Sequence, residues 1–190
     1  MSINKNYGLY TDADKTPAPV SDLSLDFIVP LDFMTEWQRC GLVADFLARY
    51  QSFNFKNPEK ALNVLSTVVN ELLENGVKFS ADKNKLVNLS LRYYGSTIEI
   101  ETVNTCDQTQ AVVLDTYIER LKNNDSETMF LEQIQKSEDG GSDVSGLGLI
   151  TILKDYDAQL GIRISPKTEG DTNYDVFVKV VLSTAGIEKI

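Results

Sequence analysis

Residues Ala61–Phe79, ALNVLSTVVNELLENGVKF, carry the strongest helical pattern in the chain. Their apolar residues recur at intervals of three and four, which predicts an amphipathic helix packed on a hydrophobic core. Asn57-Pro58-Glu59 precedes the stretch and is typical of a helix start, because the first turn tolerates a proline. The apolar stripe consists of Leu62, Leu65, Val68, Val69, Leu72 and Leu73.

Three polar residues lie on the same predicted helix at intervals of four and three, namely Glu71, Asn75 and Lys78. This spacing places them along one stripe beside or opposite the apolar one. An amide oxygen can bind Mg²⁺, a carboxylate can accept a proton from a hydroxyl or water, and an ammonium can contact a phosphate. The trio therefore indicates phosphate chemistry. The alternative is an ordinary solvated helix face, because charged residues mostly face water.

Strand and helix patterns alternate on both sides of this helix. Leu25–Val29 is a short apolar run typical of a strand, and Phe33–Tyr50 has apolar residues at helical spacing. Leu86–Tyr93 and Thr97–Val103 alternate apolar and polar residues, as half-buried strands do, and Tyr94-Gly95-Ser96 predicts a hairpin turn between them. Farther on, the predicted helices are Val112–Asn123, Ser126–Lys136 and Leu149–Tyr156, and the predicted strands are Ala158–Ser165 and Asp175–Leu182.

This order of elements predicts an α+β fold. We expect a two-layer sandwich in which helices cover one face of a mixed, mostly antiparallel sheet. The chain divides into three expected parts. Residues 1–21 are polar and form a flexible or loosely docked leader, residues 22–56 form a strand–helix extension, and residues 57–190 form the main domain.

The composition of the 190 residues excludes several classes of function. With 28 acidic and 18 basic residues the net charge is −10, which argues against general binding to nucleic acid or to anionic membranes. The chain contains no histidine, so triads with a histidine base, imidazole zinc sites and a histidine phosphorelay are excluded within it. Catalysis would have to use carboxylates, amides, lysines, hydroxyls or a bound metal.

The expected location is the cytoplasm. Cys40 and Cys106 lie far apart in sequence, and two buried free thiols in a reducing compartment are expected, with a single disulfide as the unsupported alternative. No apolar run approaches the roughly 20 residues that a membrane helix needs. The polar stretch Met1–Lys15 lacks a secretory pattern.

A second candidate site follows a loop rich in Gly, Ser and Asp, Ser137–Gly148. Ser145-Gly146-Leu147-Gly148-Leu149 stands where this loop meets the next predicted helix. Glycines let a ligand approach the backbone closely, and a helix N-terminus offers free N–H groups to a phosphate. The alternative is a flexible loop with a helix start that glycine assists.

Taken together, the two motifs resemble a known family. Asn70–Ser80, NELLENGVKFS, resembles the N box of the Bergerat-fold ATPases, which include gyrase and the histidine kinases, and Ser145–Leu149 resembles their second glycine box. The form Glu71-x-x-x-Asn75 is most similar to the anti-sigma-factor serine kinases and the SiaB-type kinases. The resemblance covers roughly residues 57–183. It implies the Bergerat ATP-binding fold.

The resemblance also implies a role for each matching residue. Asn75 would coordinate a Mg²⁺ that bridges the phosphates of ATP, and Glu71 would polarise the attacking hydroxyl or water. Lys78 would lie near the phosphates, while Gly146, Leu147 and Gly148 would cradle them with backbone amides. Residues 123–144 would form the ATP lid.

One departure from the family concerns its first glycine box, Asp-x-Gly-x-Gly. The matching stretch here is Val103-Asn104-Thr105-Cys106-Asp107, so Asn104 stands where the Asp that binds adenine is expected, and no glycine follows. An Asn oxygen can accept a hydrogen bond but lacks charge, which makes it a weaker anchor. Asp107 is an alternative anchor if the register slips. Gly76, inside the helix in place of the usual alanine, predicts a close approach of a neighbouring backbone.

These observations give two functional hypotheses. The first is an ATP- and Mg²⁺-dependent Ser/Thr protein kinase that phosphorylates a STAS-type antagonist in a bacterial partner-switching pathway, as the resemblance implies. The second is a catalytically inactive protein-binding module of the same fold, with a degenerate nucleotide pocket. An ATPase without a protein substrate ranks lower. By analogy, the N-terminal extension would form a homodimer, and Trp37, Phe46 and Tyr50 are expected to be core or interface aromatics.

Overall fold

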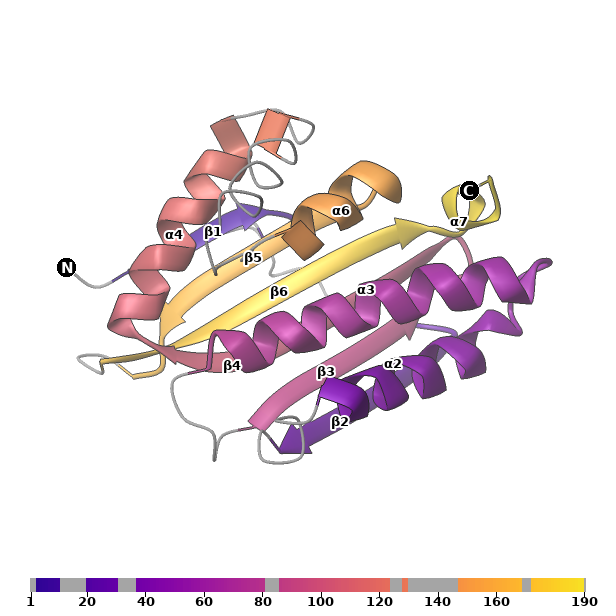
Figure 1. The fold of residues 1–190 in the computed structure, drawn as a ribbon, viewed down its shortest axis with the longest axis horizontal. Coiled ribbons are helices and arrows are strands. Elements are labelled where there is room, and N and C mark those ends of the chain that lie inside the picture. Colours follow the sequence, from indigo (N-terminus) through magenta and orange to yellow (C-terminus); the bar gives the residue numbers. More distant parts are fainter. Residues whose placement is uncertain are drawn as a thin grey trace.

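The computed structural model describes residues 3–10, 20–30, 37–80, 86–123, 128–129, 147–168 and 172–189. Figure 1 shows their arrangement, with the helix of residues 58–78 lying along the middle of the sheet. In chain order the elements are β1 (Lys5–Gly8), β2 (Leu23–Pro30), α2 (Trp37–Ser52), α3 (Pro58–Lys78), β3 (Leu86–Tyr93), β4 (Thr97–Asp107), α4 (Gln108–Asn123), α6 (Leu147–Asp155), β5 (Gln159–Pro166), β6 (Asn173–Ser183) and α7 (Thr184–Lys189).

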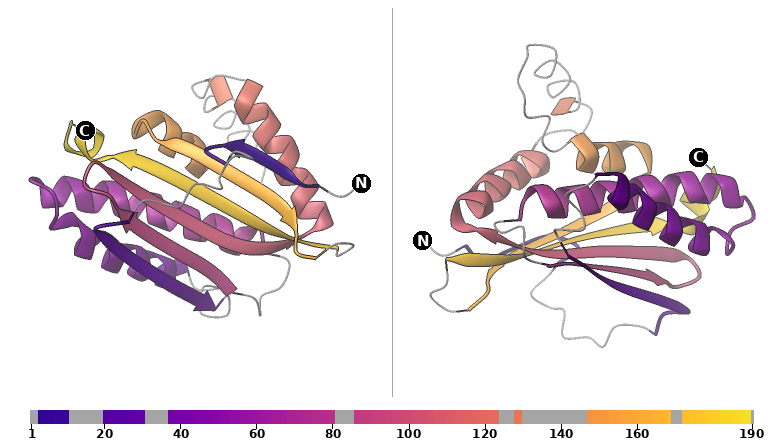
Figure 2. Two further views of the ribbon diagram at one scale, coloured as in Figure 1. Left: turned by 180° about the vertical axis from the view of Figure 1, so that it is seen from behind. Right: turned by 60° about the horizontal axis from the view of Figure 1, so that its bottom comes forward.

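The six strands form one sheet in the order β1-β5-β6-β4-β3-β2. Helices α2, α3, α4 and α6 cover one face of it, and no described helix covers the other (Figure 2). The predicted α+β two-layer sandwich is therefore confirmed. Every strand pairing among the described residues is antiparallel, so this part of the sheet contains none of the parallel pairs that a mixed sheet would have.

The central hairpin follows the sequence prediction closely. Strand β3 has the predicted bounds, and Gly95 in the turn after it has a positive φ of 70°, a conformation that glycine adopts without strain. Strand β4 continues four residues beyond the predicted Val103. It does so because its whole length pairs with β6, from Thr97 opposite Ser183 to Asp107 opposite Asn173.

The prediction of a flexible or loosely docked leader is wrong for Lys5–Gly8, which forms the edge strand β1 and pairs with β5. Two side chains fix this strand to α4. The Lys5 ammonium lies 2.9 Å from the Asp115 carboxylate, and the Tyr7 hydroxyl donates to Asp115 as well. A strand of four residues with only one aromatic side chain has no alternation long enough to be recognised, so only its tertiary partners reveal it.

Tyr10, also in the predicted leader, is buried on the sheet face opposite the helices. Its hydroxyl donates to Glu101 of β4, and its ring packs edge-on against Phe177 of β6 with the ring centres 6.4 Å apart. The Arg163 guanidinium lies over both rings. The chain is therefore anchored on both faces of the sheet within its first ten residues.

The strand–helix extension at residues 22–56 shares the sheet and core of the main domain. Strand β2 pairs with β3 along all eight of its residues. Helix α2 packs beside α3 and buries Cys40, Ala44, Leu47 and Ala48 in the common core. The extension therefore adds an outer strand and an outer helix to one continuous structure.

Helix α3 forms the centre of the helical layer. The Asn57 side chain caps it by accepting from the Lys60 backbone N–H at 3.2 Å, and Pro58 opens its first turn, as predicted. Its buried residues face the sheet and α2. Both cysteines are buried free thiols, as expected. The core-facing residues of α3 are Ala61, Val64, Leu65, Val68, Val69, Leu72, Leu73 and Gly76.

Some predictions concern residues that the structure does not describe. Most of the helix expected over Ser126–Lys136, all but Thr128 and Met129, lies outside the described residues. So do most of the loop 137–148, including Gly146, and nearly all of the lid expected at 123–144. No helix in the described part is long and apolar enough to cross a membrane.

Candidate functional site

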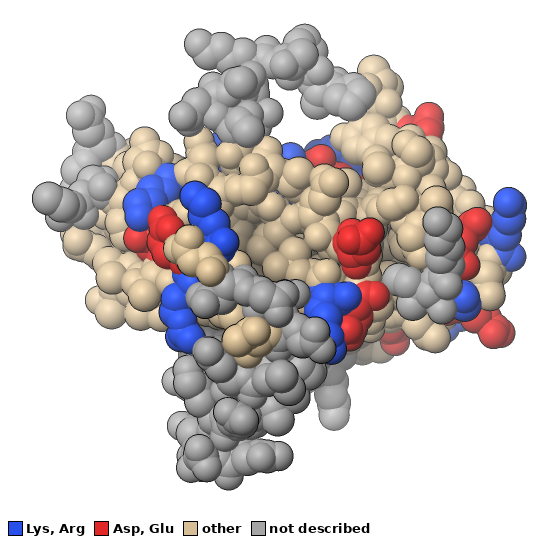
Figure 3. Space-filling view, turned by 90° about the horizontal axis from the view of Figure 1, so that it is seen from above, with Lys and Arg blue, Asp and Glu red and all other residues tan. Residues whose placement is uncertain are grey.

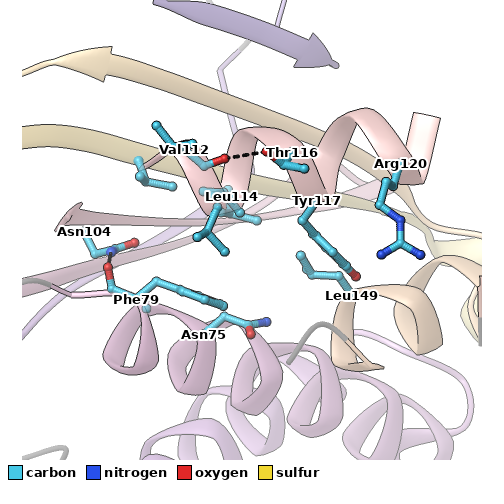
Figure 4. A pocket seen from close by; sticks show the side chains of 13 residues that line it. Asn75, Phe79, Asn104, Val112, Leu114, Thr116, Tyr117, Arg120 and Leu149 are labelled. Atoms are coloured by element: carbon cyan, nitrogen blue, oxygen red, sulfur yellow. Dashed lines mark hydrogen bonds between the residues drawn. The ribbon is translucent and has the colours of Figure 1, made fainter. Parts of the chain in front are cut away.

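A cavity of about 360 Å³ lies between the helical layer and the sheet, at the place where α3, α4 and α6 meet above β4 and β6. Figure 4 shows α3 along one wall, α4 along the other and α6 near one end. Most of its lining is apolar, with a few polar groups at the ends. The lining residues are Asn75, Gly76, Phe79, Asn104, Val112, Val113, Leu114, Thr116, Tyr117, Arg120, Leu149, Val176 and Val178.

Asn75 is the predicted residue that most clearly belongs to this cavity. It projects from α3 at the floor (Figure 4), and its amide nitrogen is buried without a hydrogen-bond partner in the structure. A buried, unpaired amide N–H is costly, by about 1–3 kcal/mol, so such a group is a reason to expect a ligand or an ordered water. The other polar atom of this side chain is an amide oxygen, a kind of ligand that hard cations accept.

Asn104 forms the opposite end of the site. It lies on the helix-facing side of β4 and is buried. Its amide nitrogen donates to the Phe79 carbonyl oxygen at 3.3 Å and to the Ser80 hydroxyl at 3.4 Å. The nitrogen is thus already paired, which leaves the amide oxygen as the acceptor that this side chain can offer to a ligand.

The alternative anchor, Asp107, has a structural role in the described chain. Its carboxylate accepts from the Gln110 backbone N–H at 2.8 Å, and the Gln110 side chain accepts from the Asp107 backbone N–H. This reciprocal pair is a capping box, which begins α4 directly after β4. The structure therefore gives no support to a register slip that would bring Asp107 into the site of Asn104.

Glu71 lies against the start of α6. A Cβ atom added to Gly148 would fall 1.8 Å from the Glu71 Oε2 atom, so the carboxylate occupies the space that the missing side chain leaves. Burial raises the pKa of Glu71 above its ordinary value, and the negative charge of Glu74 raises it further. A carboxylate with a raised pKa is a stronger base, which suits proton abstraction near neutral pH.

The remaining predicted site residues are placed as follows. Leu147 is the first residue of α6 and Gly148 the second, so both belong to a helix N-terminus, as predicted, whereas Gly146 lies outside the described residues. Lys78 lies in the last turn of α3, is exposed, and does not line the cavity. The structure brings Asn75 and Asn104 into one cavity and sets Glu71 beside it against Gly148.

Gly76 corrects one detail of the sequence analysis. The close neighbour is the Val87 side chain of β3, not a backbone: a Cβ at position 76 would lie 3.2 Å and 3.3 Å from the two Val87 methyl groups. Glycine here lets α3 lie close to the sheet. The helix pattern alone could not identify which element would approach.

Sequence reasoning missed two residues of the site, Tyr117 and Arg120 of α4. Both line the cavity, at the end opposite Asn104 (Figure 4). Their only sequence signal is their spacing of three, which puts them on one side of the helix. That signal could not show which wall α4 would form.

The α2 aromatics prove to be surface residues. Phe46 and Tyr50 are more than half exposed, as are the large apolar residues Leu42 and Phe53, although the Phe46 ring also packs edge-on against Phe27. Their exposure excludes the core for Phe46 and Tyr50, and the expectation of an interface stays a prediction. The side chain of Trp37 lies outside the described residues. A groove of about 650 Å³ runs beside this stripe, lined in part by Asp22, Arg49 and Tyr93.

The surface of the molecule seen from above carries few charged side chains. Figure 3, which views the molecule from above, shows a hollowed, largely uncharged surface with a few basic and acidic groups around it. No group of three or more Asp, Glu, Cys or His side chains within the described ranges could hold a metal ion. A divalent cation at Asn75 would therefore need its other ligands from the phosphates of a bound ligand and from water, as is common for Mg²⁺.

Comparison with solved structures finds a similar fold in the crystal structure of the SiaB–SiaC complex from Pseudomonas aeruginosa. The TM-score is 0.56 at 16% sequence identity, and the match covers 83% of this chain and 89% of that chain. None of the known protein-family models matches the sequence, and no curated protein sequence matches it either. At this level of identity the likeness concerns the fold.

Proposed function

We propose that the chain binds ATP with Mg²⁺ in the cavity between α3, α4 and α6, and that it acts as a Ser/Thr protein kinase of the Bergerat type in partner-switching signalling. The observation that carries the proposal is the cavity itself. It joins an apolar chamber to the buried, unpartnered amide of Asn75, next to the Glu71 carboxylate. Of the residues that the N-box resemblance singled out, Asn75 lines this space and Glu71 lies beside it, whereas Lys78 lies outside.

The described residues fit the base of an adenine nucleotide. The middle of the cavity is lined by aliphatic and aromatic side chains, which suit a planar ring. The Asn104 amide nitrogen is paired with backbone and hydroxyl oxygens, so its oxygen is the group that would accept from an exocyclic amino group. Adenine has such a donor at the matching position, whereas guanine presents an oxygen there. The site is therefore expected to prefer adenine.

The phosphate end is supported by Asn75 and α6. The Asn75 oxygen would supply one ligand to Mg²⁺, which neutralises phosphate charge when bound, and the backbone amides at the start of α6 would face the phosphates. Lys78, which is exposed and outside the cavity, would have only a peripheral role.

Glu71 is the proposed general base. With its raised pKa it would accept the proton of a Ser or Thr hydroxyl on a protein substrate as that oxygen bonds to the transferred phosphorus and the bond to the leaving nucleotide oxygen breaks. The structural neighbour belongs to a SiaB–SiaC complex, which supports a protein partner for this chain too. We propose a STAS-domain antagonist as that partner.

Calorimetric titration of the full chain with ATP and Mg²⁺ tests the binding step. We expect binding that depends on Mg²⁺, and Asn75→Ala should abolish the Mg²⁺-dependent part. Asn63→Ala, the same substitution at an exposed position on the same helix, is the matched control and should bind as wild type. Absence of any heat at millimolar ATP would refute nucleotide binding.

Transfer is tested separately with a purified STAS-domain protein and labelled ATP. Glu71→Gln should bind ATP nearly as wild type but lose transfer, while Glu59→Gln, in the exposed first turn of α3, should retain both. Full transfer by the Glu71 variant would show that another group is the base.

The second candidate function is a protein-binding module without catalysis, and the exposed apolar stripe on α2 favours it. Leu42, Phe46 and Tyr50 recur along α2, and Phe53 follows directly after the end of the helix. Each is more than half exposed, and the stripe lies beside a groove and next to the outer strand β2. Contiguous exposed apolar groups of this kind mark protein interfaces. This surface would serve a homodimer or another partner.

Sedimentation velocity and pull-down with a STAS-domain protein test this surface. Phe53→Ser removes the most exposed aromatic of the stripe and should weaken the association without loss of folding. The non-catalytic function is supported if the wild-type chain captures the partner but binds no ATP.

A further inference from the structure

The side chain of Asn104 is joined to the end of α3 at two points. Its amide nitrogen donates to the Phe79 carbonyl oxygen at 3.3 Å and to the Ser80 hydroxyl at 3.4 Å. The Ser80 hydroxyl in turn donates to the Gly76 carbonyl oxygen, one helical turn back, at 2.5 Å. These bonds link strand β4 to the last turn of α3 at one end of the cavity.

The chemistry of the two partners allows only one orientation of the Asn104 amide. A carbonyl oxygen can only accept, and a serine hydroxyl has a single proton to donate. Because Ser80 donates that proton to Gly76, its oxygen can only accept from Asn104. If the amide turned over, its oxygen would face two acceptors and its nitrogen would lose both bonds, which is unfavourable for a buried group. The nitrogen is therefore held on the α3 side.

The oxygen of the amide lies on the opposite edge of the group. Figure 4 shows it pointing away from the Phe79 carbonyl. Most of the residues that line the cavity are apolar, so a hydrogen bond to this oxygen is stronger there than in water, and an unmatched acceptor is more costly. A carboxylate at position 104 would offer an oxygen whichever way it turned, but an amide does so in only one of two orientations. The selectivity of the site thus depends on what holds the amide.

We infer that Ser80, which does not itself line the cavity, is a positioning residue that fixes the Asn104 oxygen as the acceptor and thereby sets the preference for the nucleobase. The inference rests on the nucleotide binding proposed above and adds the residue that makes recognition of the base selective. A base with an exocyclic amino group donates to this oxygen. A base with an oxygen at the same position brings two acceptors together and binds more weakly.

Calorimetric titration of the full chain with ATP and inosine triphosphate (ITP) tests the inference, because ITP carries an oxygen in place of the adenine amino group. Wild type should bind ATP at least about tenfold more tightly than ITP. Ser80→Ala leaves the Phe79 carbonyl as the one remaining partner of the amide in the structure, so this ratio should fall at least about threefold, mainly through weaker binding of ATP. Ser80→Thr keeps the hydroxyl and should retain the ratio of wild type.

Ser66→Ala is the matched control. Ser66 lies on the same helix but outside the cavity, and its hydroxyl also donates to a carbonyl oxygen of the preceding turn, that of Asn63 at 3.2 Å. The control therefore loses the same kind of bond without touching Asn104, and it should keep the ratio of wild type. Circular dichroism of each variant establishes that it is folded. The inference is overturned if Ser80→Ala keeps the ratio of wild type, or if Ser66→Ala lowers it equally.

A second measurement needs no nucleotide. In heteronuclear NMR spectra of the full chain, the side-chain N–H signals of Asn104, identified by their loss in Asn104→Ala, should shift in Ser80→Ala and stay in place in Ser66→Ala. Unchanged signals in Ser80→Ala would overturn the positioning role. If wild type binds ATP and ITP equally, the inferred selectivity alone fails. If wild type binds neither, the proposed nucleotide site and the selectivity that rests on it fail together.

Discussion

Glycine at position 148 is the best place to test whether α3 and α6 meet as described. A Cβ atom there would lie 1.8 Å from the Glu71 Oε2 atom and 2.6 Å from its Cδ atom. Since ordinary contacts begin near 3.4 Å, Gly148→Ala must displace the carboxylate by roughly 1.5 Å. The contact partner is the end of a flexible side chain, so displacement is possible without unfolding.

Two opposing terms set the effect on stability. Replacing glycine by alanine where the backbone is compatible stabilises by about 0.4–1 kcal/mol, because it reduces the conformational entropy of the unfolded chain. Forcing Glu71 out of its preferred rotamer costs roughly 0.5–1.5 kcal/mol. In wild type these terms nearly cancel. In a Glu71→Ala background the second term disappears, so Gly148→Ala should then stabilise by up to about 1 kcal/mol. For a chain of 190 residues this corresponds to a Tm rise of about 2–4 °C.

The assay is a double-mutant cycle of four proteins, measured by thermal and urea denaturation. Gly41→Ala is the control, because a Cβ at this helical position meets nothing within 4 Å and should stabilise equally in both backgrounds. A coupling of roughly 1 kcal/mol between positions 71 and 148 is expected. If their effects add within about 0.3–0.5 kcal/mol, the Glu71 carboxylate does not lie against Gly148.

The same substitution has a predicted consequence for the proposed kinase activity. A base displaced by about 1.5 Å should lower the rate of phosphoryl transfer by about 100-fold. ATP affinity should change much less, because the apolar chamber and Asn104 are untouched. A variant that loses binding and transfer together would indicate a collapsed site instead.

Three further predictions concern pH dependence, the Asn104 end and the edge strand. Because burial and the charge of Glu74 raise the pKa of Glu71, folding disfavours the ionised carboxylate, and the contribution of Glu71 to stability falls as pH rises above the ordinary glutamate range. The Glu71→Gln variant should therefore be more stable than wild type toward neutral pH but not in acid. A difference in unfolding free energy that stays constant across pH, measured by urea titration, would contradict this prediction. Asn104→Asp introduces the residue that the resemblance to the Bergerat-fold ATPases would lead one to expect here. It should destabilise by about 1–3 kcal/mol in chemical denaturation, because a carboxylate oxygen would replace the N–H that donates to the end of α3, whereas unchanged stability would show that the amide is not held this way. Tyr7→Phe removes the hydroxyl that binds Asp115, so it should cost about 1 kcal/mol and speed hydrogen exchange in β1; exchange that stays slow would show that main-chain pairing alone holds the strand.

The elements that could be predicted are those whose signal is local and periodic. For helix α3, the cap at Asn57, the first-turn proline and the apolar stripe can all be recognised within about twenty residues of sequence. In the hairpin β3–β4, apolar and polar residues alternate on both sides of Gly95. Strand β1 and the last four residues of β4 have no comparable pattern. They form because another strand lies alongside them, and that partner is distant in sequence.

The candidate site also has a part that the sequence could predict and a part that it could not. Spacing by four along α3 was enough to single out Glu71 and Asn75, because residues that share a helix face are fixed by helix geometry alone. Spacing could not show that Glu71 would fill the space above Gly148, or that the Asn104 nitrogen would be paired with the end of α3. Those contacts join elements separated by many residues.

The sequence by itself determined the α+β class, the central amphipathic helix and the polar trio on it, since each depends on the periodicity of a single segment. Only the tertiary structure decided that Tyr117 and Arg120 of α4 would line the same cavity as Asn75. It also decided that Asp115 and Glu119 of the same helix would pair with Lys5 of β1. The physical reason is that packing selects which face of each helix meets the sheet and its neighbours. That choice depends on the whole core and is not written in any one segment.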